Sequence, residues 1–450
     1  RLPLCVHTLS WLKAKPGVFR RRKHMANLDT PSPLDLLVVG GGAAGFLAAI
    51  TAAELKPGLR ILIVEKSSRP LGKVLISGGG RCNLTHACFE PAQLVQHYPR
   101  GGAALRGAFT RFQPKDTLVW FEERGVKLKT EADGRVFPVS DSAQTIVDCL
   151  LNAARRAGIH LQTGCTVQAI NLSGEADTPF QITLGEGESQ RGLFPRRLLL
   201  ATGGERGGMQ LAASLGHRII PPVPALFSLS LPDPRLAGLA GLSVPQARLR
   251  LLDENGSPPR LAGAEQQGAL LVTHWGLSGP VVLRLSSWGA RWLHERQYRA
   301  GLAVNWLGIS PEAALEELRA GKVATPRHKL EARSPFPELP LRLWKKLCAA
   351  AQIRPEQNWA DLSRLQLQHL AQELCEGRYQ VAGKGQFKDE FVTCGGVDLD
   401  EVDFHTMHSR IVPGLYFAGE VLDIDGLTGG FNFQSAWTTG WLAGRAIAQM

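Results

Sequence analysis

Asp35-Leu36-Leu37-Val38-Val39-Gly40-Gly41-Gly42-Ala43-Ala44-Gly45 is the stretch of sequence that decides the fold. Its apolar first half predicts a buried strand, and residues 46–55 continue as a helix. The three glycines at 40, 42 and 45 permit a tight turn, close approach to a pyrophosphate and close helix–strand packing. A second apolar strand over 60–65 ends in Glu65, where a carboxylate can accept hydrogen bonds from ribose hydroxyls. The stretch therefore predicts a dinucleotide site, and the acid disfavours a 2′-phosphate.

Two later motifs favour FAD over NAD. Ala201-Thr202-Gly203-Gly204 follows a predicted strand, and Gly414-Leu415-Tyr416-Phe417-Ala418-Gly419-Glu420 lies near the C-terminus. Both resemble flavin-domain motifs of the glutathione-reductase-like superfamily. The second motif usually ends in Asp, so a contact of Glu420 to the ribityl chain is expected with a longer side chain. Val167 is expected to contact adenine through its backbone.

The C-terminal segment is expected to hold the flavin ring. Residues 421–433 lead into a predicted helix over 434–448, whose N-terminal N–H groups and dipole can stabilise negative charge on a reduced flavin. Small residues at a spacing of four predict close packing of this helix and the first one. They are Ala436, Gly440 and Gly444 in the C-terminal helix, and Gly45, Ala49 and Ala53 in the first helix.

The most distinctive stretch is Gly72-Lys73-Val74-Leu75-Ile76-Ser77-Gly78-Gly79-Gly80-Arg81-Cys82-Asn83-Leu84-Thr85. Its glycine triplet followed by Arg and Asn suits close wrapping of an anionic, planar cofactor. With Thr273-His274-Trp275-Gly276-Leu277-Ser278-Gly279-Pro280 and the segment 414–433, it resembles the BaiN and aminoacetone oxidase-like family of NAD(P)/FAD-dependent oxidoreductases. The resemblance runs from about residue 35 to the end.

This resemblance implies an α/β fold, in which a Rossmann-like FAD-binding domain is interrupted by a β-barrel plus helical insert domain. The change in residue composition and in the pattern of apolar residues along the chain predicts the same boundaries. The expected parts are a leader at 1–32, the FAD-binding domain at 33–216 and 391–450, and the insert at 217–390. Within the insert we expect a β-barrel over about 217–310 and helices over about 311–390.

The net charge of +11 is concentrated at the front of the chain. Residues 1–24 contain seven Lys or Arg and no acid, which leaves 44 basic against 40 acidic residues afterwards. We expect translation to start at Met25, or else an organelle transit segment. With no apolar run of membrane length and no Cys-x-x-Cys pair, the sequence predicts a cytoplasmic protein without a disulfide framework, structural zinc or dithiol redox centre.

The predicted cofactor-binding residues come from both ends of the chain. They are Gly40, Gly42, Ala43, Ala44, Gly45, Glu65, Lys66, Lys73, Ser77, Gly78, Gly80, Arg81, Cys82, Asn83, Val167, Ala201, Thr202, Gly203, Gly419, Glu420, Asp423, Gly429, Gly430, Phe431 and Asn432.

Catalytic residues are unknown from the sequence, with His274 and Cys82 as weak candidates. His274 could donate a proton to a substrate, since imidazole titrates near neutrality. Cys82 has no cysteine at redox spacing and is more often a packed residue. His405 and His408, near Asp403, are expected to be surface histidines, and no metal site is expected.

The chain contains no second dinucleotide fingerprint, so any NAD(P)H should bind transiently at the flavin face. The leading hypothesis is an NAD(P)H-dependent reductase of an activated C=C or carbonyl compound. One alternative is an amine oxidase that produces hydrogen peroxide, and another is an RNA-acting or regulatory flavoprotein. The mild charge after residue 24 gives little support for nucleic acid, so the expected partner is a small-molecule substrate, without nucleic acid or membrane. The oligomeric state is open.

Overall fold

A seven-stranded sheet built from both ends of the chain forms the centre of the first domain in this computed structural model, which describes residues 34–186, 189–385 and 392–449. Five consecutive strands of this sheet, up to and including one edge strand, pair in parallel, and the two strands at the other edge pair antiparallel. In spatial order the strands are β20 (Val402–Asp403), β21 (His408–Ser409), β22 (Leu415–Phe417), β10 (Pro195–Leu200), β1 (Leu34–Val39), β2 (Ile61–Glu65) and β6 (His160–Thr163).

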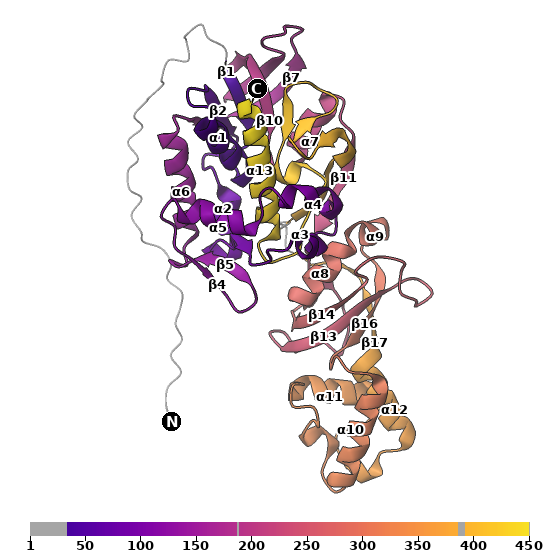
Figure 1. Cartoon of the computed structure of the whole chain (residues 1–450). Coiled ribbons are helices and arrows are strands. Elements are labelled where there is room, and N and C mark those ends of the chain that lie inside the picture. Colours follow the sequence, from indigo (N-terminus) through magenta and orange to yellow (C-terminus); the bar gives the residue numbers. More distant parts are fainter. Residues whose placement is uncertain (1–33, 187–188, 386–391, 450) are drawn as a thin grey trace. The chain divides into compact units, whose positions relative to one another are not determined.

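Two helices from opposite ends of the chain pack against one another beside this sheet (Figure 1). They are α1 (Ala43–Leu55) and α13 (Phe431–Gln449). A Cβ atom added at Gly440 would lie 2.6 Å from the Ala44 carbonyl oxygen, and one added at Gly444 would lie 2.3 Å from the Ala48 carbonyl oxygen. The small-residue stripe of the C-terminal helix therefore makes the predicted close contact. Its partners on α1 are the alanines one position before the predicted stripe.

Smaller elements complete the Rossmann-like domain. Its other helices are α2 (Gly72–Gly80), α3 (Pro91–Leu94), α4 (Gly102–Phe109), α5 (Pro114–Glu122), α6 (Ala143–Arg156) and α7 (Arg206–Ser214). Its other strands are β3 (Thr85–His86), β4 (Leu128–Thr130), β5 (Arg135–Pro138), β7 (Thr166–Leu172), β8 (Phe180–Glu186) and β9 (Ser189–Leu193). The α/β, Rossmann-like character expected from the sequence is confirmed.

The chain leaves and re-enters this domain through an antiparallel pair of strands, β11 (Ile219–Ala225) and β19 (Val392–Val397). Between them in the sequence lies a second seven-stranded sheet, whose hydrogen-bonding order has two ends. Its strands, in spatial order, are β17 (Gly377–Val381), β16 (Ala300–Asn305), β13 (Ser243–Leu252), β14 (Glu265–Val272), β15 (Gly276–Ser278), β12 (Leu229–Ser230) and β18 (Gly383–Lys384). Closure into the expected barrel stays a prediction, as do the boundaries at 217 and 390.

Helices lie before and after strand β16 in the sequence of this region. They are α8 (Pro280–Trp288), α9 (Ala290–Glu295), α10 (Pro311–Ala324), α11 (Leu341–Ala350) and α12 (Arg364–Glu376). The last three share one hydrophobic core with the second sheet, with Trp306 and Trp344 among its largest buried side chains. The expected leader at 1–32 and the end of the expected insert at 386–390 lie outside the described residues. No described helix has the length and apolar character needed to cross a membrane.

Candidate functional site

The three glycines of the first loop have three different roles. Added Cβ atoms at Gly40 and Gly45 would lie 2.3 Å from the Ala201 carbonyl oxygen and 2.2 Å from the Gly40 carbonyl oxygen, so both positions require glycine for packing. A Cβ atom at Gly42 would meet nothing within 4 Å. Gly42 is the N-cap of α1, and no side-chain capping bond is made to the first N–H groups of the helix. This end of the helix has the form of a pyrophosphate site.

Glu65 lies at the expected place, beside the glycine loop. One carboxylate oxygen accepts a hydrogen bond from the Gly41 N–H (2.8 Å), and the other accepts from the Ser67 N–H (2.8 Å). The Cys165 N–H donates to the Glu65 carbonyl oxygen (3.0 Å), which places the start of β7, and with it Val167, next to the same strand end. The expected ribose and adenine residues are therefore neighbours.

A charged pair connects two of the motifs that the sequence singled out. Lys73 Nζ donates to Glu420 Oε2 over 2.6 Å, although the residues are far apart in the chain. An added Cβ at Gly203 would lie 3.8 Å from that carboxylate and 3.9 Å from Lys73 Nζ. Close by in sequence, the buried Thr202 Oγ1 has no hydrogen-bond partner among the described residues. Lys66 pairs with Glu205 over 2.7 Å at the surface.

The glycine-rich stretch 72–83 is an irregular helical turn followed by a loop. Ser77 is extended, and Gly78, Gly79 and Gly80 have positive φ angles of 56°, 69° and 85°. Added Cβ atoms at Gly79 and Gly80 would meet nothing within 4 Å, and the apolar Ile76 side chain is 75% exposed. An open glycine surface beside an exposed aliphatic side chain suits a flat, largely apolar ring.

Two side chains of this stretch have partners within the protein. Arg81 donates to Glu131 (2.7 Å) and lies over the Phe137 ring at 4.0 Å, so its contact to a flavin stays a prediction. Cys82 is buried, and burial raises the pKa of its thiol to about 12. The thiol therefore stays protonated at neutral pH, which does not favour a nucleophilic role.

The start of α13 meets the end of this stretch. Asn83, with its side-chain oxygen toward the helix, accepts from the Gly430 N–H (3.0 Å) and donates to the Thr85 carbonyl oxygen (3.1 Å). Asn432 makes two hydrogen bonds of 2.8 Å to the backbone of Gly426, which hold the preceding loop. Gly429 and Gly430 both have positive φ angles, of 130° and 93°. The structure thus brings the two predicted flavin segments together at one helix N-terminus.

The acidic residues of segment 421–425 are paired with arginines. Asp425 is fully buried, accepts from Arg100 Nε over 2.6 Å, and has a pKa that burial raises to about 6. Arg100 also donates to the Ser287 carbonyl oxygen (2.6 Å), at the end of α8. Asp423, a predicted flavin contact, accepts from Arg291 of α9 at 2.6 and 2.7 Å. These bonds connect the predicted flavin segment to α8 and α9.

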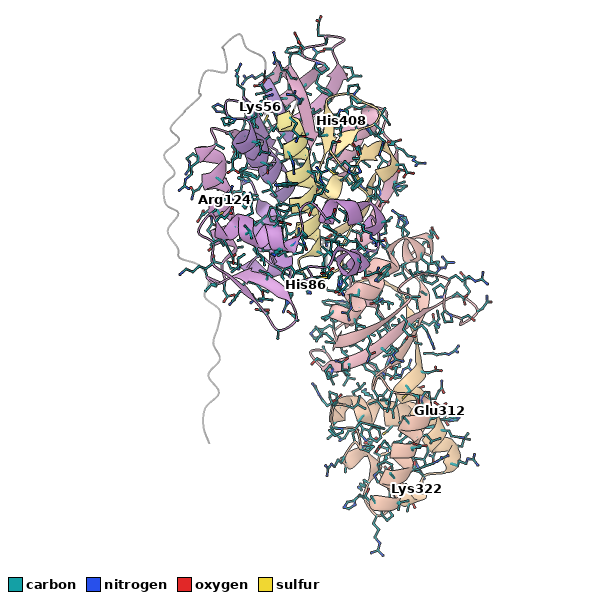
Figure 2. All side chains as sticks on the ribbon, in the orientation of Figure 1. Lys56, His86, Arg124, Glu312, Lys322 and His408 are labelled. Atoms are coloured by element: carbon teal, nitrogen blue, oxygen red, sulfur yellow. The ribbon has the colours of Figure 1, made fainter. Side chains whose placement is uncertain are left out.

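Two histidines that the sequence did not single out lie against Phe431. The His97 ring stacks on the Phe431 ring with centroids 4.2 Å apart, and the His86 ring lies 4.7 Å away (His86 is labelled in Figure 2). His86 Nδ1 is 3.2 Å from the Gly429 carbonyl oxygen. Burial lowers the pKa of both imidazoles, and Arg284 contributes to the lowering at His97. Both side chains are therefore neutral at pH 7.

The other candidate histidines lie elsewhere. His274 is exposed in the loop between β14 and β15. His408 Nε2 accepts from the Gly414 N–H over 2.9 Å, which gives that ring a structural role. Among the described residues, no three His, Cys, Asp or Glu side chains are grouped so that they could hold a metal ion.

Acid is expected to destabilise the folded chain through its buried imidazoles. The pKa values of His86, His97, His217 and His408 are all lowered, first by burial, so the folded state binds fewer protons than the unfolded one. Their stabilising effect is complete above the unfolded pKa of about 6.5 and is lost as pH falls below it. Asp425 acts in the opposite direction, because its raised pKa favours proton binding in the folded state between about pH 4 and 6.

Urea unfolding between about pH 7.5 and 6 measures the effect of the histidines, because Asp425 takes up its proton mostly at lower pH. We expect the midpoint to fall toward pH 6, and to fall less in His97→Asn. An unchanged pH dependence in that variant would contradict a half-buried His97 with a lowered pKa.

A family model and two relatives match nearly the whole of the described chain. The model described as "HI0933-like protein Rossmann domain" matches residues 34–446. The chain is 31% identical over 419 residues to the ribosomal RNA dihydrouridine synthase of Escherichia coli, covering 90% of this chain and 96% of that protein. It is 30% identical over 429 residues to the 3-dehydro-bile acid delta(4,6)-reductase of Clostridium scindens, covering 92% and 98%. A solved 3-ketosteroid delta1-dehydrogenase from Sterolibacterium denitrificans aligns with a TM-score of 0.46 and 14% identity, over 92% of this chain and 99% of that one.

Proposed function

The chain belongs to the HI0933-like family of flavin-dependent oxidoreductases, and on that premise we propose that it reduces a C=C bond conjugated to a carbonyl group. The names of the two full-length relatives describe this same change of bonding. Dihydrouridine is uridine with two hydrogens added across the C=C bond of its ring, and a delta(4,6)-reductase removes C=C bonds from a bile acid that carries a 3-keto group. The substrates differ, but the reacting group is shared.

The residues present fit bound FAD. The open N-terminus of α1, the carboxylate of Glu65 and the exposed glycines at 79 and 80 offer a phosphate site, a ribose partner and a flat surface. When bound there, FAD supplies hydride transfer at its N5 atom. The N-terminal dipole of α13 supports this role, because it would stabilise the negative charge of a reduced flavin. That arrangement is the observation that carries the proposal.

Reduction of a conjugated C=C bond also requires a proton on the second carbon. His97 and His86 lie against Phe431 at the start of α13, and their lowered pKa values make the protonated imidazole a minor form at pH 7 that gives up its proton readily. We therefore propose these imidazoles as the proton donors, in competition with His274 in the insert.

Substituting the two groups of histidines separates these proposals. We expect His97→Asn to slow the reaction of reduced enzyme with substrate by about 10²-fold or more, the contribution typical of general acid catalysis. The exposed His274→Asn is the matched control and should leave that rate unchanged. If His274→Asn slows this reaction while His97→Asn and His86→Asn react at the normal rate, the proton donor is His274 of the insert instead.

The electron donor is proposed to be NADH or NADPH, which binds transiently at the flavin face. Anaerobic addition of each nucleotide to the purified holoenzyme should bleach the flavin absorbance. Failure of both to bleach it would exclude this donor. Peroxide formed in air with small amines alone would favour an amine oxidase in place of the reductase.

A further inference from the structure

The positive charge of the chain after the leader is concentrated in one part of the insert. Residues 319–354 contain nine Lys or Arg and two Glu, a net charge of +7, whereas residues 25–450 together contain 44 basic and 40 acidic residues. Residues 25–450 without this segment therefore contain 35 basic and 38 acidic residues and are slightly acidic. An even distribution would give no electrostatic reason for a polyanionic partner, but this distribution does.

Hydrogen bonds and packing hold the segment before α11 in place. The His328 carbonyl oxygen accepts from the Trp359 N–H (3.0 Å), and the Pro326 carbonyl oxygen accepts from the Ala360 N–H (2.9 Å). The Leu330 carbonyl oxygen accepts from Trp344 Nε1 (3.0 Å), which fixes this segment beside α11. The basic residues of this segment therefore lie on a well-ordered part of the surface.

Helix α11 carries basic side chains on the side that faces away from the hydrophobic core. Leu343, Trp344, Leu347 and Cys348 are buried in the core, so positions 342 and 345 face away from it. We call the exposed residues of this region the basic face. They are Arg327, Lys329, Arg333, Arg342, Lys345 and Arg354.

The side chains of the basic face are not neutralised by ion pairs within the part of the chain that the structure describes. None of the six forms an ion pair with any residue that the structure describes. In the Rossmann-like domain, by contrast, Arg124 pairs with Glu54 (2.7 Å) and Arg81 with Glu131 (2.7 Å). Figure 2 shows Glu312 and Lys322 at opposite ends of α10. Just before the start of that helix, the Ser310 carbonyl oxygen lies 3.7 Å from the Sγ atom of Cys375 in α12. The acidic start of α10 therefore lies beside the end of α12, and its basic end leads to the basic face.

We propose that the basic face binds the phosphate backbone of an RNA that carries a uridine substrate. The choice of RNA rests on the proposed function, because the uracil ring carries a C=C bond conjugated to a carbonyl. The proposal departs from the expectation of a chain without a nucleic-acid partner, which counted charge over the whole body.

Binding of the full-length holoenzyme to ribosomal RNA, without any reductant, tests this inference. The test variant is Arg342→Gln/Lys345→Gln/Arg327→Gln. The control is Lys56→Gln/Lys115→Gln/Arg156→Gln, which removes three exposed basic residues of the Rossmann-like domain. Each lost phosphate contact should lower the slope of log affinity against log salt by about 0.7 to 0.9. We expect the test variant to bind at least about tenfold more weakly near 0.1 M salt, with a slope lower by about 2.

Other outcomes would overturn the inference. Equal binding by the test and control variants would remove the basic face from RNA recognition. Binding to vesicles of phosphatidylglycerol, but not to RNA, would identify a membrane surface instead. Flavin reduction by NAD(P)H and reoxidation by a small enone are measured on the same samples. If the unsubstituted holoenzyme carries out both reactions but does not bind RNA, only this inference is overturned and the proposed function stands.

Discussion

Gly42→Glu should yield a folded protein that no longer binds FAD. A Cβ at this position meets nothing within 4 Å, and its φ of −96° is open to any residue, so the substitution has little structural cost. The new carboxylate would lie at the N-terminus of α1, where the pyrophosphate is expected. Two like charges about 4 Å apart repel by about 4 kcal/mol at an effective dielectric of 20, which corresponds to roughly a thousandfold loss of affinity.

Flavin absorbance per chain after purification, together with the far-ultraviolet circular dichroism spectrum, measures this result. The matched control is Gly107→Glu, an exposed glycine in α4 whose added Cβ also meets nothing within 4 Å. It should retain its flavin. Full flavin content in Gly42→Glu would show that the dinucleotide does not bind at this loop.

Gly444→Val should be the most destabilising substitution among those proposed. Its Cβ would lie 2.3 Å from the Ala48 carbonyl oxygen and 2.8 Å from the Thr51 Cβ, and a backbone oxygen cannot move away by changing rotamer. The two helices must separate, so we expect a loss of about 3 kcal/mol or more, at or above the upper end for overpacked cores. Against a total stability of about 5–15 kcal/mol, this loss would leave part of the chain unfolded.

The urea midpoint of the FAD-free protein measures this loss without a contribution from cofactor binding. Gly107→Val provides the control, since it adds the same side chain to a helix where nothing lies nearby. Equal midpoints for the two variants would contradict the close packing of α1 on α13.

The dinucleotide site could be predicted because its signals are local. Gly40, Gly42 and Gly45 follow a strand directly, and Glu65 ends the next strand, so their spacing alone determines their geometry. The close packing of α13 could also be predicted from its small residues. The sequence placed the contact on α1 one residue too late, since a pattern of small residues does not determine the rotation of one helix against another.

The charged and aromatic parts of the site could not be predicted, because they depend on long-range contacts. His97 meets Phe431, and Arg100 meets Asp425, across more than three hundred residues. No local pattern distinguishes these side chains from surface residues. Similarly, Arg81 follows a glycine triplet, but its partner Glu131 lies fifty residues away. The basic face was missed because charge was summed over the chain.

A single anaerobic turnover tests the central claim most directly. Holoenzyme is reduced with two electrons per flavin and mixed without oxygen with a conjugated enone, with uridine-containing ribosomal RNA, or with the saturated counterpart of the enone. The account predicts that a C=C acceptor restores the flavin absorbance and gains two hydrogens, while the saturated compound does neither. A flavin that stays reduced with every C=C acceptor and recovers only when air is admitted would contradict it.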